Sequence, residues 1–291
     1  MAPTQHDPTD EQWQTRFEHA RELLNNVQRE AELAHLVAQA HHATELTALC
    51  VYGASALARE RRVGLLAGSY NPLTVAHVAL AEAARHAARL DTLVWGVAAV
   101  TVDKEQVERA SLPARLAQLQ AYLACSHSPA AGDALVIFNH GLYVEQAQAL
   151  RRLLAAEAEL TIIVGFDKIV QILDPRYYEN REQALARLFA LARLLVAPRA
   201  DQSEAALAAL LAQPANQPYA RFIDYCPLDP RYAIDSSTEA RALAASLSPD
   251  EVMRSPILRH LLTPEGLALA QTGAYVADAP AKNGWSDGQP H

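Results

Sequence analysis

Short apolar runs alternate with segments of helical periodicity from Val63 onward, and this alternation constrains the fold more than any other feature. The predicted strands span residues 63–67, 92–97, 134–138, 160–164, 194–197 and 222–225. The predicted helices span residues 75–89, 113–126, 144–157, 181–190, 203–211 and the region 237–273. Such alternation is typical of a parallel sheet covered by helices on both faces. The sequence therefore predicts an α/β fold, a Rossmann-like doubly wound parallel sheet.

Three segments are predicted along the chain. Residues 9–49 carry apolar side chains at helical spacing, so residues 1–60 are expected to form an N-terminal helical extension. The alternating region, residues 61–276, is expected to be one domain. Residues 277–291 are polar and rich in Gly and Pro, and are expected to be a disordered tail.

Composition excludes several classes of function. The net charge of −8 argues against a nucleic-acid partner. The three cysteines are far apart, with no metal-ligand spacing, so the pattern indicates neither a zinc site nor a disulfide framework. No signal peptide is evident, and no apolar run approaches the roughly 18 residues of a membrane span. A cytoplasmic protein without a membrane partner is expected, and a homo-oligomer stays open.

The loop after the first predicted strand carries the most informative motif. Residues 63–77 read VGLLAGSYNPLTVAH, in which an apolar run ends at Gly68 and a helix begins near Val75. Such a joint directs backbone N–H groups and the positive end of a helix dipole toward one sheet edge, where phosphates bind. Thr74 and His77 share one face of the first helical turn. The motif indicates a phosphate site, although Thr74 alone also fits a helix N-cap.

A second helix start combines hydroxyl groups with a cation. Residues 234–241 read IDSSTEAR, and Ser236 with the glutamate three residues later fits a common capping box. Ser237 and Thr238 add hydroxyls beyond what a cap needs. Arg241 lies one turn further on, where a cation is normally unfavourable unless an anion binds there. Together the two segments predict a clamp that holds a triphosphate from two sides.

At this point the chain resembles a known family. GSYNPLTVAH (68–77) and SSTEAR (236–241) resemble the two motifs of nucleotidylyltransferases with a (His/Thr)-x-Gly-His signature, in particular the nicotinamide/nicotinate mononucleotide adenylyltransferases. The resemblance spans about residues 63–276. It includes VWGVAAVTVDKEQ with Trp95 and Lys104, ARLAQL with Arg115, IIVGFDKI with Asp167, and LLVAPR.

The resemblance implies transfer of AMP from ATP to a phosphate acceptor, in the first place nicotinamide or nicotinate mononucleotide, with release of pyrophosphate. Magnesium would accompany the triphosphate and keep several waters, so no protein metal ligand is expected. The resemblance implies that the catalytic residues are His77, Thr74, Lys104 and Arg241. It implies that the nucleotide contacts Gly68, Ser69, Tyr70, His77, Asp167, Ser236, Ser237, Thr238 and Arg241, with Asp167 on a ribose. It implies acceptor binding by Trp95, Lys104 and Arg115, where Trp95 or a tyrosine stacks on a flat ring.

Two positions and two segments depart from the family pattern. Ala76 replaces a Gly, which is compatible only with a helical backbone rather than positive φ. Asp235 occupies a position that is usually apolar. The segments 140–143 (HGLY) and 174–178 (DPRYY) replace a Ser-Tyr-Thr-type stretch and a tryptophan-rich segment, respectively. The acceptor pocket is therefore where this chain differs most from the family.

Other functions stay open on the sequence alone. A nucleotide-binding protein or a nucleoside triphosphatase on the same fold would keep both motifs. A transferase with another acceptor, such as phosphopantetheine or a CTP-dependent alcohol phosphate, would also keep them. A dinucleotide oxidoreductase or a P-loop enzyme is disfavoured, because the chain lacks Gly-x-Gly-x-x-Gly after the first strand and lacks Gly-x-x-x-x-Gly-Lys-Ser/Thr.

Overall fold

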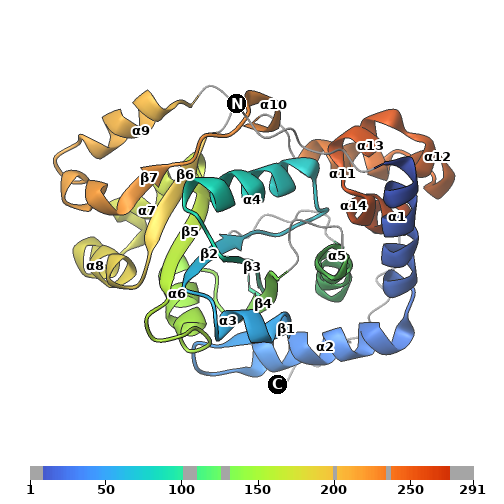
Figure 1. The fold of residues 1–291 in the computed structure, drawn as a ribbon, viewed down its shortest axis with the longest axis horizontal. Coiled ribbons are helices and arrows are strands. Elements are labelled where there is room, and N and C mark those ends of the chain that lie inside the picture. Colours follow the sequence, from blue (N-terminus) through green and yellow to red (C-terminus); the bar gives the residue numbers. More distant parts are fainter. Residues whose placement is uncertain (1–8, 101–109, 126–131, 199–201, 234–236, 276–291) are drawn as a thin grey trace, which may run out of the picture.

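A seven-stranded sheet forms the centre of the molecule (Figure 1). The structure, a computed structural model, describes residues 9–100, 110–125, 132–198, 202–233 and 237–275. The strand order is β1-β4-β3-β2-β5-β6-β7, parallel throughout except that β1 runs antiparallel to β4. The predicted Rossmann-like sheet is thus confirmed. The strands are β1 (Ala48–Tyr52), β2 (Arg62–Ala67), β3 (Thr92–Ala98), β4 (Ala134–Phe138), β5 (Glu159–Gly165), β6 (Arg193–Ala197) and β7 (Ile223–Tyr225).

Helices cover both faces of this sheet, because successive strand side chains point to opposite sides. Val63 and Leu65 of β2 belong to a core with α6, α7 and α8, whereas Leu66 belongs to a core with α2, α4 and α5. The α-helices are α1 (Asp10–Leu24), α2 (Val27–His42), α3 (Ala54–Leu57), α4 (Val75–Ala87), α5 (Leu112–Ala124), α6 (Tyr143–Arg151), α7 (Phe166–Leu173), α8 (Arg181–Leu191), α9 (Glu204–Leu211), α10 (Pro230–Ala233), α11 (Ser237–Ala245), α12 (Pro249–Arg254), α13 (Pro256–Leu261) and α14 (Pro264–Gln271). Short 3-10 turns occupy Pro175–Tyr177 and Gln217–Phe222.

The N-terminal region is only partly the helical extension that its periodicity predicts. The helices α1 and α2 form as expected, but Ala48–Tyr52 add the antiparallel edge strand β1 to the sheet, with Leu49 paired to Ile137. Every residue of β1 is half-buried. The strand therefore lacks the alternation of buried and exposed residues that identifies a strand in a sequence, and its pairing with β4 decides its conformation.

The C-terminal helices α11 to α14 pack together with the N-terminal helix α1 and form a third layer. In Figure 1, α11 to α14 gather beside α1, at the side of the molecule where α5 lies. Arg16 of α1 forms a two-point ion pair with the buried Glu265 of α14, at N–O distances of 2.8 and 2.9 Å. The helix α14 also touches the loop after β2. A Cβ added at Gly266 would lie 2.1 Å from the carbonyl oxygen of Leu73, so only glycine fits there.

Within the described part of the chain, no helix has both the length and the apolar character needed to cross a bilayer. The predicted tail, residues 277–291, lies outside that part.

Candidate active site

The strand order reverses between β2 and β5, which lie side by side in the middle of the sheet. In open α/β sheets, ligands bind at such a switch point, just beyond the carboxyl ends of the strands. Gly68 follows β2, and Asp167 lies in the first turn of α7, directly after β5. The two predicted nucleotide segments therefore lie at one edge of the sheet, at its switch point.

The loop from Gly68 to Thr74, here called the phosphate loop, folds over a buried tyrosine. Tyr70 adopts φ 45° and is fully buried. Its hydroxyl donates to the carbonyl oxygen of Leu66, and its ring lies between the rings of His77 and Trp95, at centroid distances of 5.1 and 5.5 Å. A Cβ at Gly68 would come within 3.1 Å of the Tyr70 ring, so a glycine allows this close packing. The Tyr70 side chain is thus structural, and only its backbone is available to a nucleotide.

Side chains of helix α5 hold the backbone of the phosphate loop in place. The fully buried Gln118 donates through Nε2 to the Tyr70 carbonyl oxygen and accepts through Oε1 from Leu73 N–H at 3.1 Å. Arg115 donates to the Ser69 carbonyl oxygen at 3.0 Å. Sequence reasoning missed Gln118, although a glutamine on the apolar face of this helix was a usable signal, because a buried amide needs partners.

His77 and Thr74 form a reciprocal cap at the start of α4. Thr74 Oγ1 accepts from His77 N–H at 3.3 Å, and His77 Nδ1 accepts from Thr74 N–H at 3.1 Å. Because Nδ1 is an acceptor, the proton of the neutral imidazole resides on Nε2. Among the described residues none bonds to Nε2, and burial lowers the pKa of His77 from 6.5 to about 4. Near neutral pH, His77 therefore presents one N–H donor and no charge.

Ala76, which stands where the resemblance has a glycine, lies inside α4. The left-handed non-glycine residues of the described chain are Tyr70 and Arg89. The backbone at Ala76 is therefore helical, and its methyl group causes no conformational strain.

The second predicted segment meets the first. Arg241 of α11 donates through Nη1 to the Asn71 carbonyl oxygen at 2.7 Å and through Nη2 to Thr238 Oγ1 at 3.0 Å. Ser237 begins α11, so its hydroxyl lies at the same helix start. The guanidinium thus joins the two motifs across 170 residues of sequence. Ser236, Asp235 and Lys104 lie outside the described residues.

The structure corrects the prediction that Trp95 stacks on the acceptor. Trp95 is fully buried in the sheet core, and its indole N–H donates to the buried Asp133 at 3.1 Å. It therefore has no face available for a ligand. Arg115 is also buried, at 7% exposure, but it lines a cavity in addition to bracing Ser69.

That cavity, of about 350 Å³, opens beside the phosphate loop and extends between α6, α7 and α8. Gly68 and Ser69 line one part of it, and three tyrosines line others: Tyr143, Tyr177 and Tyr178. Several exposed apolar side chains surround it, among them Val100 (51%), Leu142 (41%) and Tyr177 (53%). A volume of this size, lined by aromatic rings and a few polar groups, suits a small flat ligand.

Comparison with known proteins places the chain in a family. A model of the cytidylyltransferase-like family matches residues 65–243, from β2 through Arg241. This chain belongs to the cytidylyltransferase-like family. It is 30% identical over 202 residues to a probable nicotinate-nucleotide adenylyltransferase of Bordetella pertussis, covering 69% of this chain and 95% of that protein. The chain is accordingly a nucleotidylyltransferase.

Solved structures of the Plasmodium falciparum nicotinic acid mononucleotide adenylyltransferase share the fold. The complex with APC aligns at a TM-score of 0.51 with 11% identity, and the complex with NaAD aligns at 0.53 with 12% identity. Each alignment covers 74% of this chain and 97% of that protein. These identities are low, so the alignments support the architecture rather than individual side-chain roles.

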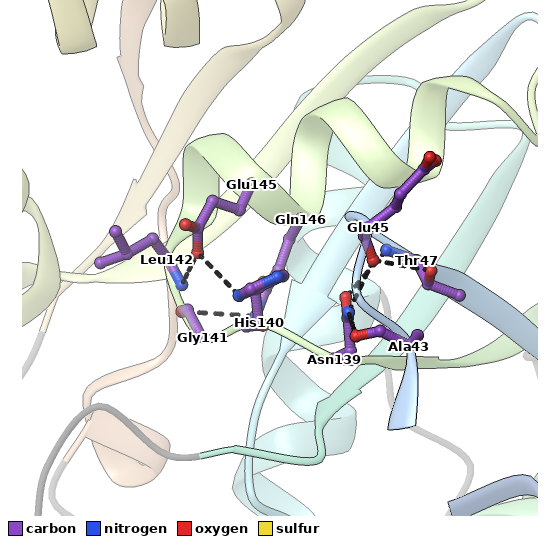
Figure 2. Close-up of polar contacts among 9 residues, drawn as sticks. All are labelled: Ala43, Glu45, Thr47, Asn139, His140, Gly141, Leu142, Glu145 and Gln146. Carbon is purple, nitrogen blue, oxygen red and sulfur yellow. Dashed lines mark hydrogen bonds and ion pairs between the residues drawn. The ribbon is translucent and has the colours of Figure 1, made fainter. Parts of the chain in front are cut away.

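Residues 140–143, one of the departures from the family pattern, lead into the start of α6, and Figure 2 shows the contacts there. Leu142 caps the helix without a side-chain acceptor, and Glu145 Oε2 accepts from Leu142 N–H at 3.3 Å instead. The preceding Asn139 donates to the carbonyl oxygens of Ala43 (3.2 Å) and Glu45 (2.7 Å). The segment after α2 therefore anchors the loop that leads into the cavity.

His77 supplies a pH-dependent part of the free energy of unfolding. Between pH 6.5 and pH 4 the unfolded chain binds a proton on this residue and the folded chain does not. Its contribution is therefore fully present above pH 6.5 and is lost as the pH falls toward 4. We expect the wild type to lose about 3 kcal/mol more than His77→Asn over this range. Urea titrations of both proteins at several pH values measure this difference, and parallel curves would contradict it.

Proposed function

We propose that this enzyme transfers AMP from ATP to nicotinamide or nicotinate mononucleotide and releases pyrophosphate. The observation that carries the proposal is the Arg241–Asn71 contact, which joins two helix-start motifs beside a cavity lined by tyrosines. The place where the two motifs meet is here called the joint. A triphosphate held at the joint would present its α-phosphorus toward that cavity. The names of the relatives support adenylyl transfer with nicotinate mononucleotide as the acceptor.

The residues at the joint would act on the triphosphate by positioning and hydrogen bonding. An oxygen of the acceptor phosphate attacks the α-phosphorus, a new P–O bond forms, and the bond to the bridging oxygen of pyrophosphate breaks. His77 would donate its Nε2–H as negative charge develops on the leaving group, with Thr74 fixing the ring. Ser237, Thr238 and Arg241 would hold the β- and γ-phosphates. Such a transfer needs no protein nucleophile.

The acceptor would occupy the cavity. Tyr177 or Tyr178 replaces Trp95 as the candidate for stacking on the pyridine ring, because both tyrosines line the cavity. Arg115 lies at the phosphate-loop end of the lining and would assist the acceptor phosphate, together with Lys104. Asp167, half-buried in the first turn of α7, would accept from a ribose hydroxyl.

Magnesium would enter with ATP. The described residues contain no cluster of three or more His, Cys, Asp or Glu side chains that could hold a metal ion. The candidate donors at the joint are hydroxyls, an imidazole and a guanidinium, which suits an ion ligated by phosphate oxygens and water. When bound, the ion neutralises part of the triphosphate charge, while the side chains at the joint fix the geometry.

One assay tests the proposal. The protein is incubated with magnesium, ATP or CTP, and a panel of acceptors that contains both pyridine mononucleotides, phosphopantetheine and an alcohol phosphate. Pyrophosphate is quantified and the product is identified by its mass. We expect pyrophosphate release that depends on ATP and on a pyridine mononucleotide, with a dinucleotide product. Release without any acceptor would indicate a nucleoside triphosphatase instead.

A further inference from the structure

Three successive carbonyl oxygens of the phosphate loop are each held by a side chain from outside the loop. The donor and acceptor pairs are Arg115 with Ser69 at 3.0 Å, Gln118 with Tyr70, and Arg241 with Asn71 at 2.7 Å. The donors belong to α5 and α11. Because a peptide unit is planar and its C=O and N–H point in opposite directions when it is trans, a held carbonyl also fixes the direction of the next N–H. The contacts at Ser69 and Tyr70 therefore orient the N–H groups of Tyr70 and Asn71.

Gln118 differs from the other two donors, because its side chain has no exposed surface. It is 0% exposed, and its neighbours Ala117 and Leu119 on α5 are buried as well. A buried amide is unfavourable unless both of its ends form hydrogen bonds. Here Nε2 donates to the Tyr70 carbonyl oxygen and Oε1 accepts from Leu73 N–H at 3.1 Å. Gln118 can therefore influence a bound nucleotide only through the backbone of the loop.

The two hydrogen bonds of Gln118 span the part of the loop that most needs support. Tyr70 adopts φ 45°, a left-handed conformation that is unfavourable for a residue with a side chain and persists only where the surroundings enforce it. One amide takes the carbonyl oxygen of Tyr70 and the N–H of Leu73, three residues later, so it closes the turn between them. Loss of that amide would leave this backbone free to relax.

The backbone held in this way presents donors that the protein does not use. Among the described residues no acceptor is hydrogen-bonded to the N–H of Ser69 or of Tyr70. Consecutive N–H groups in a turn form a concave site that favours an anion. In the proposed function the anion is a phosphate of the nucleotide, and its charge changes during the reaction. A small displacement of these donors would therefore weaken their contact with the reacting phosphate.

We propose that Gln118 is a positioning residue for nucleotidyl transfer, which sets the rate by fixing the direction of the N–H groups in the phosphate loop. The inference rests on the proposed function and deepens it. Gln118 touches no substrate. Its amide holds Tyr70 and Leu73, and these residues hold the backbone that meets the triphosphate.

The first test is Gln118→Met, which removes both hydrogen bonds at similar volume. We expect kcat to fall about tenfold to a hundredfold in the folded variant, because a displacement of about 1 Å at reacting groups costs about that factor. The matched control is Gln120→Met on the same helix. Gln120 accepts from Arg29 Nε at 2.8 Å and makes no contact with the loop, so its loss should leave kcat unchanged. Pyrophosphate release gives the rate, and circular dichroism with urea titration gives the folded fraction.

The second test is Gln118→Glu, which restores both contacts in one protonation state only. A protonated carboxyl donates to the Tyr70 carbonyl oxygen and accepts from Leu73 N–H, whereas a carboxylate only accepts and repels that carbonyl oxygen. Burial raises the pKa of such a carboxyl above its ordinary value of about 4.3. We expect kcat relative to the wild type to be highest near about pH 5 and to fall about tenfold by about pH 9, toward the level of Gln118→Met.

Two results would overturn the inference: a folded Gln118→Met with wild-type kcat, or a Gln118→Glu whose kcat keeps a constant ratio to the wild type over this pH range. A purely structural role would change the urea midpoint but would give no such pH profile. If Gln118→Met does not fold, the profile of Gln118→Glu decides alone. If the wild type releases no pyrophosphate with any acceptor, the proposed function itself fails, which is distinct from a variant with unchanged turnover.

Discussion

Replacing His77 by asparagine is expected to lower kcat about a hundred- to a thousandfold while the protein stays folded. The asparagine Oδ1 can still accept from Thr74 N–H, as Nδ1 of the histidine does at 3.1 Å, so the cap of α4 is kept. What is lost is the Nε2–H donor, and losing one such donor to developing charge costs about that factor. Pyrophosphate release measures the rate, and circular dichroism measures the fold.

The matched control for this variant is His86→Asn, since His86 is an exposed residue in the last turn of the same helix. It should retain wild-type turnover. If His77→Asn were also to retain it, the imidazole would be only a helix cap, and the proposed mechanism would lose its central donor.

Replacing Arg241 by lysine is expected to raise the KM for ATP about tenfold to a hundredfold. A lysine keeps the charge, but its single ammonium cannot donate to the Asn71 carbonyl and to Thr238 Oγ1 while also gripping a phosphate with a planar fork. The phosphate loop would also lose its tie to α11. Initial rates at varied ATP concentration give the KM.

Arg254→Lys serves as the control, because Arg254 is an exposed residue of α12, outside both motifs. It should leave the KM for ATP unchanged. An unchanged KM in Arg241→Lys would mean that the second motif only stabilises the phosphate loop and that the triphosphate binds elsewhere.

The sheet and the joint between the motifs could be predicted because local signals coincide with the tertiary fold. The apolar run of β2 ends at a glycine, and the helix after it begins with a capping threonine, so both strand and helix were placed correctly. The meeting of Arg241 with the phosphate loop followed from the same logic, since both helices begin after strands of one parallel sheet.

The lining of the cavity could not be predicted, because it depends on which side chains the packing buries. In the sequence, Trp95 looks like a residue on which a ligand ring could stack. In the structure its indole N–H donates to Asp133, which is distant in the sequence, and the side chain lies in the core. Gln146 looks like an ordinary polar residue of a helix. Only the three-dimensional structure shows that its Nε2 donates to two carbonyl oxygens, while its Oε1 has no hydrogen-bond partner among the described residues.

The contact between Gly266 and Leu73 has a consequence for biosynthesis. The phosphate loop leaves the ribosome early, but the helix that supports it from the other side, α14, is made nearly two hundred residues later. Thr263 N–H also donates to the Leu73 carbonyl oxygen, so the same late segment contributes twice. A nascent chain in which α14 has not yet left the ribosome therefore lacks both contacts at Leu73, so we expect the phosphate loop to reach its final conformation only after α14 docks.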